Sequence, residues 1–170
     1  MPRPYCITFA APVGAGKSQI AHYLSWNLGL GIFSNDTIRN EIQAEHTESL
    51  DHNPDEYFRR RDERIRAALE LGRSFIYDAS VDRRWEEYAP VADEAGFDIV
   101  VISLDWSRDH WNAMIKHKGY DPQSAQCGTW FAQHEDFVSK HDKTISLSLR
   151  DEQFSERLEY TLKHIRALLQ

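Results

Sequence analysis

A glycine-rich loop near the N-terminus carries the residue types that bind phosphate. Segment 11–18 is A-P-V-G-A-G-K-S, which matches the pattern G-x-x-x-x-G-K-[ST] at every fixed position except the first, where Ala11 replaces glycine. In such a loop, backbone N–H groups turn toward a β-phosphate, Lys17 spans the β- and γ-phosphates, and Ser18 offers its hydroxyl to Mg²⁺. We therefore expect ATP and Mg²⁺ as cofactors. The expected nucleotide contacts are Gly14, Ala15, Gly16, Lys17, Ser18 and Gln19.

The structural alternative for this loop is an ordinary turn from a strand to a helix, capped by Ser18. Phosphate binding is favoured because an apolar, β-branched run over 5–10 predicts a strand before the loop, and a helical pattern follows it. Two other nucleotide signatures are missing from the sequence. The lack of N-K-x-D disfavours a guanine-specific GTPase, and the lack of G-x-G-x-x-G disfavours a nicotinamide or flavin cofactor.

An acid and a base follow the second predicted strand. Asp36 lies two residues beyond a predicted strand over 31–34, and Arg39 follows one helical turn later on the same face. The carboxylate could accept the proton of an attacking hydroxyl, and the guanidinium could hold a substrate phosphate. The structural alternatives are a helix N-cap for Asp36 and a solvated charge for Arg39. The phosphate loop before them favours the catalytic roles.

Asp78 ends a third predicted strand, over 74–78. A carboxylate at the end of an apolar strand is costly to bury unless it is paired or serves a metal. Near Ser18, it would hold Mg²⁺ directly or through water, and its structural alternative is capping of the next helix. Ser18 and Asp78 are therefore the predicted magnesium ligands.

The elements that must position these groups alternate between strands and helices. Strands are expected over 5–10, 31–34, 74–78, 97–104 and 144–149, with helices between them and after them. This alternation implies a three-layer α/β/α sandwich with a five-stranded, mostly parallel sheet. The 170 residues contain no linker or repeat, which predicts a single domain over 1–170. Because ligands bind at the carboxyl ends of parallel strands, the loop, Asp36 and Asp78 should share one cleft.

The composition is typical of a soluble globular protein. The chain is 41% hydrophobic and 28% charged, and its net charge of −7 argues against a large non-specific nucleic-acid surface. Cys6 and Cys127 form neither a metal-ligand spacing nor a disulfide framework. No apolar run suits a signal peptide or a membrane span, so we expect a cytoplasmic protein without a membrane partner.

Four segments together resemble the small P-loop kinases grouped with polynucleotide 5′-kinase and the zeta-toxin-like phosphotransferases, which carry an AAA-type ATP-binding domain. The segments are A-x-x-G-A-G-K-S, S-N-D-T-I-R, L-G-R-S-F-I-Y-D-A-S-V-D-R-R and A-D-E-A-G-F-D-I-V-V-I-S-L, and the likeness covers about residues 5–106. It implies a nucleoside- or nucleotide-kinase-like topology with catalytic roles for Lys17, Asp36 and Arg39. It also relates Asp78 to the acid on the third strand of these kinases.

The resemblance further implies a short helical lid that closes over ATP, here at about 106–126. Lids of this family usually carry two or more arginines, whereas this segment offers Arg108, Lys116 and Lys118. Lysine neutralises phosphate charge but lacks the planar fork that grips it bidentately. Arg108 and Lys116 are the lid residues expected to contact ATP.

A basic segment, F-R-R-R-D-E-R-I-R over 58–66, lies on the helix expected between the second and third strands. It could bind a phosphorylated or polynucleotide acceptor. The arginines concerned are Arg59, Arg60, Arg61 and Arg64. The alternative is a solvated helix face with i,i+4 ion pairs such as Arg59 with Glu63 and Asp62 with Arg66.

Two classes of function are compatible with these observations. The leading hypothesis is an ATP-dependent phosphotransferase that moves the γ-phosphoryl of Mg-ATP to a polynucleotide 5′-hydroxyl or to a small-molecule hydroxyl. The alternative is a nucleotide-binding switch or degenerate kinase that acts through a protein partner. The lysine-rich lid favours the alternative, and the pairing of Asp36 with Arg39 opposes it.

Overall fold

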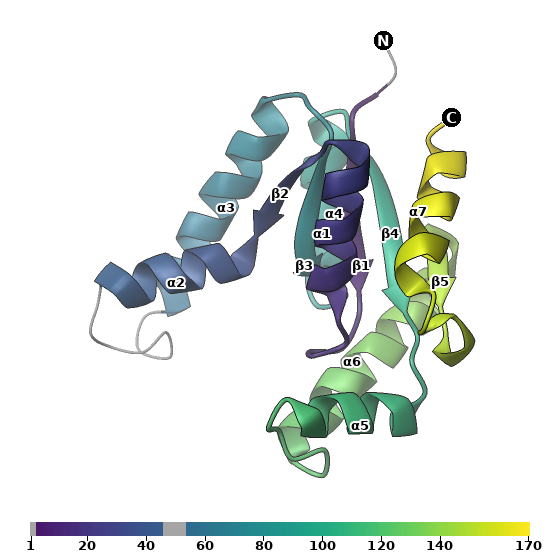
Figure 1. The fold of residues 1–170 in the computed structure, drawn as a ribbon. Coiled ribbons are helices and arrows are strands. Elements are labelled where there is room, and N and C mark those ends of the chain that lie inside the picture. The colour runs from purple at the N-terminus through teal and green to yellow at the C-terminus, as the bar shows by residue number, and fades with distance from the viewer. Residues whose placement is uncertain (1–2, 46–53) are drawn as a thin grey trace.

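A five-stranded sheet forms the centre of the computed structural model, which describes residues 3–45 and 54–170 (Figure 1). The strands are β1 (Tyr5–Ala10), β2 (Gly31–Ser34), β3 (Phe75–Ser80), β4 (Asp98–Leu104) and β5 (Ile145–Leu149). Their order is β2-β3-β1-β4-β5, and all neighbouring pairs are parallel. Helices connect the strands, as parallel pairing requires. The predicted α/β/α sandwich is confirmed, with a sheet that is wholly parallel.

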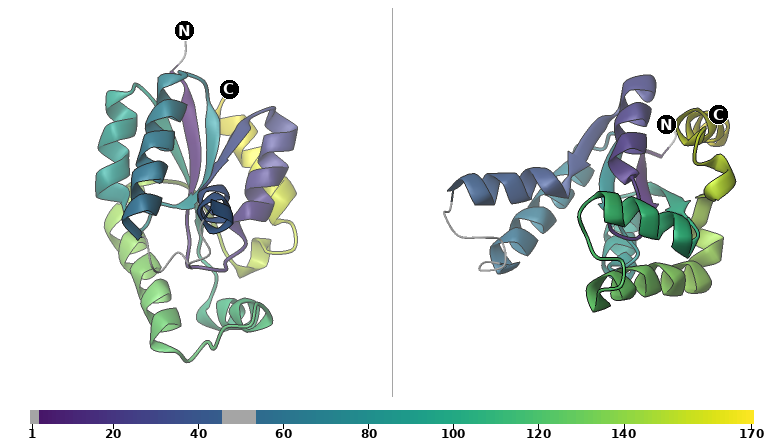
Figure 2. Two further views of the ribbon diagram at one scale, coloured as in Figure 1. Left: turned by 90° about the vertical axis from the view of Figure 1, so that its left-hand side faces the viewer. Right: turned by 60° about the horizontal axis from the view of Figure 1, so that its bottom comes forward.

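Helices cover both faces of this sheet (Figures 1 and 2). One face carries α1 (Lys17–Leu28) and α7 (Arg157–Leu168), and the other carries α3 (Pro54–Glu70) and α4 (Trp85–Glu94). Beyond the carboxyl ends of the strands lie α5 (Arg108–His117) and α6 (Ala125–His141), the latter reaching back along the sheet. The remaining helix, α2 (Asn35–Glu45), stands beside α3. Two short 3₁₀ turns, Asp142–Thr144 and Asp151–Gln153, flank β5.

The central strand, β1, is buried on both faces because successive side chains of a strand point to opposite sides. Ile7 and Phe9 join the core under α1 and α7, whereas Cys6 and Ala10 join the core under α3 and α4. The apolar run over 97–104 favours a central place for β4. The structure puts β4 one position away, between β1 and β5, and a strand there is also covered on both faces.

β3 is two residues longer at its carboxyl end than predicted. Asp78 consequently pairs with Ser34 of β2 inside the strand instead of ending it. The extension joins the phosphate loop, because the Ser80 hydroxyl accepts a hydrogen bond from Ala11 N (2.9 Å) and donates one to Ala11 O (2.8 Å). These two hydrogen bonds hold the first residue of the loop at the end of β3.

The helices α2 and α3 begin close to their predicted starts. The helix expected from Asp36 to about residue 49 begins at Asn35 and is described as far as Glu45; residues 46–49 lie outside the described residues. Pro54 is the first residue of α3, where its fixed φ suits a helix, whereas its predicted cap, Asn53, is not among the described residues. None of the helices in the described part of the chain has the length and hydrophobicity that a membrane span requires.

Candidate active site

The phosphate loop between β1 and α1 depends on two glycines. Gly14 (φ +81°) and Gly16 (φ +93°) lie in the left-handed region, which side chains with a Cβ rarely adopt. A Cβ at Gly14 would also come within 2.5 Å of Ile115 Cδ1, because α5 packs directly on the loop. The positive φ therefore favours glycine at position 14, and any larger residue would also have to displace the Ile115 side chain.

Two tryptophans hold the back of this loop. Trp106 Nε1 donates a hydrogen bond to Ala15 O (3.0 Å), and Trp111 Nε1 donates one to Val13 O (2.9 Å). Both indoles are buried, with 3% and 0% of the residues exposed. With these carbonyls held on the outside, the loop's N–H groups can turn inward toward a phosphate. The tryptophans near the predicted lid are therefore loop supports as well as core residues.

We expect Trp111→Phe to weaken nucleotide binding more than it weakens the fold. Phenylalanine retains most of the ring packing but leaves Val13 O without its donor, and one such hydrogen bond contributes about 1 kcal/mol. The dissociation constant of Mg-AMPPNP, a non-hydrolysable ATP analogue, should therefore rise about fivefold in calorimetric titration.

The matched control for that variant is Trp85→Phe. Trp85 packs edge-on against Phe137 in the core on the α3 and α4 side of the sheet, whereas Trp111 belongs to the core on the other side. The Trp85→Phe variant should have a lower melting temperature than wild type and an unchanged nucleotide affinity. Equal affinities in the two variants would contradict a supporting role for Trp111.

One large cavity, of about 1170 Å³, opens at the carboxyl ends of the strands. Its walls bring together most of the residues predicted from the sequence: Gly14, Gly16, Lys17, Ser18, Gln19, Asp36, Arg39 and Asp78. Ala15 is buried behind the loop and does not line the cavity. The shared cleft expected at this edge of the sheet is therefore present.

The two lid residues predicted to contact ATP, Arg108 and Lys116, do not face the cavity in this structure. Arg108 packs its guanidinium over the rings of Trp111 (5.5 Å) and Phe131 (4.5 Å), and neither Arg108 nor Lys116 lines the cavity. Lys118, just beyond the end of α5, does line it. In this conformation the lid cation that faces the phosphate loop is Lys118.

Lys17 is electrostatically coupled to two acids. Burial lowers the pKa of Lys17, and the negative charges of Asp82 and Asp78 oppose that shift. A cation that is already partly stripped of water and faces carboxylates can exchange them for phosphate oxygens at little further desolvation cost. This environment suits the role that the sequence predicts for Lys17.

Asp36 and Arg39 lie at the mouth of the cavity in the first turns of α2. Arg39 Nη1 contacts Asp36 Oδ1 at 3.0 Å, and the two side chains are 49% and 70% exposed. The guanidinium also lies over the ring of Tyr57, 5.2 Å from its centre. Because both side chains are accessible and line the cavity with Lys17, an acceptor hydroxyl could approach Asp36 without disturbing the core.

The predicted magnesium ligands fit the ion. Asp78 is 9% exposed and lines the cavity, and its carboxylate makes no hydrogen bond to any described residue, while Ser18 stands in the first turn of α1. No cluster of three or more His, Cys, Asp or Glu side chains suited to a metal occurs in the described ranges. Mg²⁺ does not need one, since it takes most of its ligands from nucleotide phosphates and water.

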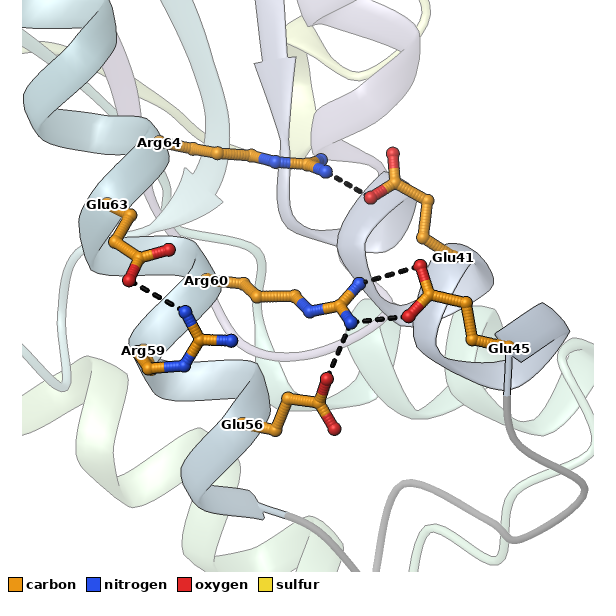
Figure 3. Close-up of polar contacts among 7 residues, drawn as sticks. All are labelled: Glu41, Glu45, Glu56, Arg59, Arg60, Glu63 and Arg64. Atoms are coloured by element: carbon orange, nitrogen blue, oxygen red, sulfur yellow. Dashed lines mark hydrogen bonds and ion pairs between the residues drawn. The ribbon is translucent and has the colours of Figure 1, made fainter.

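The basic segment on α3 is neutralised by glutamates (Figure 3). Arg60 pairs with Glu45 and Glu56, and Arg64 pairs with Glu41, which joins α3 to α2. The predicted pair of Arg59 with Glu63 is confirmed at 2.7 Å. The predicted pair of Asp62 with Arg66 is wrong, because Asp62 contacts Arg61 instead. This arrangement favours a solvated helix face over a nucleic-acid surface, with Arg61 as the exception.

A buried chain of polar side chains beside the cavity was not predicted. His134 Nε2 contacts Asp105 Oδ1 at 3.1 Å, and its Nδ1 lies 3.7 Å from Asp82 Oδ2. The side chains of His134 and Asp82 are only 5% and 2% exposed. These residues come from α6 and from the segments after β3 and β4, so no local pattern relates them. The one available signal was the presence of acids directly after two strands.

This chain makes stability depend on pH. Burial alone would lower the pKa of His134, but the hydrogen bond with Asp105 and the proximity of Asp82 raise it above its usual value. The folded state therefore binds a proton more tightly than the unfolded state does. The contribution of His134 to stability is complete below about pH 6.5 and is lost as pH rises through the raised pKa of its imidazole.

We expect the free energy of unfolding, measured in urea, to decrease as pH rises from about 6.5 to 8. His134→Gln should flatten this slope because it removes the titrating group, whereas His22→Gln, at an exposed site on α1, should preserve it. A slope that is identical in both variants would assign the pH dependence to other groups.

The comparisons with known proteins agree with this architecture. A gluconokinase from Sinorhizobium meliloti has a similar structure (17% identity, TM-score 0.64, 99% of this chain and 95% of that chain), as does a sugar kinase from Janibacter sp. HTCC2649 (21%, 0.63, 97% and 95%). An APS kinase from Mycobacterium tuberculosis, solved with AMPPNP and APS, is also similar (16%, 0.59, 98% and 99%). At these identities the likeness establishes the fold.

No curated protein matches the chain. The finer resemblance, to polynucleotide 5′-kinase and zeta-toxin-like enzymes, stays a prediction. A family model does match, that of the AAA domain named AAA_33, over residues 11–139. Since this match runs from the phosphate loop through α6, the chain belongs to the AAA_33 family of AAA domains.

Proposed function

We propose that the protein is an ATP-dependent phosphotransferase that moves the γ-phosphoryl of Mg-ATP to a hydroxyl of a small acceptor. The observation that carries this proposal is the shared cavity, whose walls include Lys17 of the phosphate loop and the Asp36–Arg39 pair. A pure nucleotide-binding site has no use for an accessible carboxylate at its open end. The gluconokinase, sugar kinase and APS kinase folds support phosphotransfer in general.

In the proposed reaction, the acceptor oxygen attacks the γ-phosphorus while the bond to the β,γ-bridging oxygen breaks. Asp36 takes the proton of the attacking hydroxyl, and ADP carries away the bond's electron pair. Lys17 neutralises charge on the β- and γ-phosphates, and Arg39 steadies the transferring group. Mg²⁺, held from Ser18 and Asp78, would supply further charge neutralisation. Most of the rate acceleration comes from positioning.

A small acceptor is favoured over a polynucleotide. The arginines that would track a nucleic-acid backbone, Arg59, Arg60 and Arg64, are each paired with glutamate (Figure 3). Binding a phosphate chain there would require these pairs to break, which offsets the gain from the new contacts.

The rival function is a nucleotide-binding switch that acts through a protein partner. Its support is the position of Arg108, which is held against aromatic rings rather than directed into the cavity. A lid without an arginine at the phosphates would bind ATP but turn it over slowly.

The two functions differ in what stimulates ADP formation. The test is a coupled assay of ADP release from Mg-ATP in the presence of sugars, acidic sugars, nucleosides, alcohols and 5′-hydroxyl oligonucleotides, each added separately. A phosphotransferase should release ADP faster with one small acceptor than with buffer alone. A rate unchanged by every compound would favour the switch.

A further inference from the structure

The end of the cavity away from the phosphate loop is rich in arginine. Seven basic and four acidic residues line the cavity as a whole, although the chain carries a net charge of −7. Lys17, Lys118 and Arg83 belong to the nucleotide end, because the charges of Arg83 and Lys118 both act on Lys17. The other four are Arg39, Arg61, Arg66 and Arg84. These arginines come from α2, α3 and the residue that precedes α4, so they lie beyond the phosphate loop that would hold the triphosphate of ATP.

Arg61 is the most unusual of these arginines. Its side chain is only 7% exposed, although buried arginines normally have complete sets of partners. Its Nε donates to Asp62 Oδ1 at 2.9 Å and its Nη2 contacts the same oxygen, whereas its Nη1 makes no hydrogen bond with a described residue. Since Arg61 lines the cavity, donors of this buried guanidinium remain available to a ligand.

A second arginine shares the ring on which Arg61 rests. The guanidinium carbons of Arg61 and Arg84 lie 5.2 and 4.8 Å from the centre of the Phe58 ring. Arg84 also pairs with Glu87, which is 62% exposed and screened by solvent. Two guanidiniums positioned by one aromatic ring form a preorganised fork for an anion, with little side-chain freedom left to lose on binding.

Tyr77 connects this fork to the predicted catalytic base. Its hydroxyl donates to Asn35 Oδ1 at 3.2 Å, and Asn35 directly precedes Asp36. Burial raises the pKa of Tyr77 to about 12, and the nearby positive charge of Arg61 opposes that rise. Arg61, Tyr77 and Asn35 all line the cavity together with Asp36, which places Arg61 on the acceptor side.

We propose that Arg61 and Arg84 bind an anionic group, a carboxylate or a phosphate, on the acceptor whose hydroxyl faces Asp36. This proposal rests on the proposed phosphotransferase function and adds the substrate class: a small hydroxylated acid rather than a neutral sugar or alcohol. Anchoring the anion would fix the acceptor's hydroxyl relative to the γ-phosphate, which is the positioning that phosphoryl transfer needs.

The test uses inorganic sulfate as the probe and the full chain saturated with Mg-AMPPNP, so that the phosphate loop is already filled. Isothermal titration should detect sulfate binding to this complex. Arg61→Gln should weaken that binding about tenfold or more, since hydrogen bonds to a charged group are among the strongest. Arg84→Gln, at a less buried site, provides the same readout if Arg61→Gln does not fold. Arg59→Gln is the matched control, because Arg59 also lies on α3 but outside the cavity.

Competition then identifies the group. D-Gluconate and glycerol 3-phosphate should each displace sulfate, the better competitor indicating carboxylate or phosphate, whereas uncharged D-glucose should not. Sulfate binding that is absent, or that is equal in wild type, Arg61→Gln and Arg84→Gln, would overturn the proposal. Mg-AMPPNP affinity is measured in the same experiments. If Mg-AMPPNP does not bind, the result counts against the phosphotransferase function itself.

Discussion

Lys17→Ala should abolish phosphoryl transfer and weaken ATP binding. The side chain faces the carboxylates of Asp82 and Asp78 and lines the cavity at the phosphate loop, and Lys118 lies beside the same loop. Loss of a preorganised cation that acts on developing charge costs about 10²- to 10³-fold in rate per interaction. Because Lys17 would contact two phosphates, we expect a fall of at least about 10³-fold in turnover. Rates of ADP release and calorimetric titration with Mg-AMPPNP provide the measurements.

The control for this variant must separate a lost contact from a damaged fold. Lys163→Ala removes an exposed lysine from α7, far from the cavity, and should leave both rate and affinity unchanged. Thermal unfolding of Lys17→Ala should show a folded protein, although Asp82 and Asp78 lose a neighbouring positive charge. A folded Lys17→Ala protein with wild-type affinity and turnover would remove the phosphate loop from the mechanism.

Asp36→Asn should reduce phosphoryl transfer by roughly 10²- to 10⁴-fold, the usual contribution of a positioned general base. Asparagine keeps the size of the side chain but cannot accept the acceptor's proton. The predicted N-cap alternative for Asp36 is wrong, because α2 begins at Asn35 and Ser34 Oγ accepts the hydrogen bond from Asp36 N (3.3 Å). The ion pair with Arg39 is exposed, so its loss should change the melting temperature little. Affinity for Mg-AMPPNP should stay within about twofold of wild type, because Asp36 is on the acceptor side.

The same variant distinguishes three roles for Asp36. A general base predicts a loss of rate alone, whereas a nucleotide switch predicts altered nucleotide affinity or conformation with no transfer to lose. A solvated acid in the first turn of α2 with no catalytic role predicts almost no effect in any assay. Asp109→Asn, in the first turn of α5 and outside the cavity, is the matched control for replacing an acid at a helix start.

The local parts of the site could be predicted because short-range rules determine them. The glycine loop needs residues within one turn, and both Gly14 and Gly16 adopt the left-handed conformations that the pattern requires. Asp36 and Arg39 are three residues apart on one helix, so their contact follows from helix geometry. Strand alternation was sufficient to bring these groups to one edge of the sheet.

The parts that escaped prediction depend on contacts between distant segments. Trp106 and Trp111 reach carbonyls about ninety residues earlier in the chain, and their apolar neighbours made them look like ordinary core residues. The extra length of β3 depends on Ser80 bonding to Ala11, which a propensity argument along the strand does not include. The pairing of Arg60 and Arg64 with glutamates of α2 became visible only once α2 was placed beside α3.

The most direct test of the phosphotransferase assignment is to follow the γ-phosphate itself. Incubation of the protein with γ-labelled Mg-ATP and each acidic or neutral hydroxyl compound, followed by chromatography, shows whether label moves to the acceptor, to water or nowhere. We expect covalent label on a small hydroxylated acid, at a rate that Asp36→Asn lowers at least a hundredfold. Label found only in ATP and inorganic phosphate, with every acceptor and at equal rates in wild type and Asp36→Asn, would contradict it.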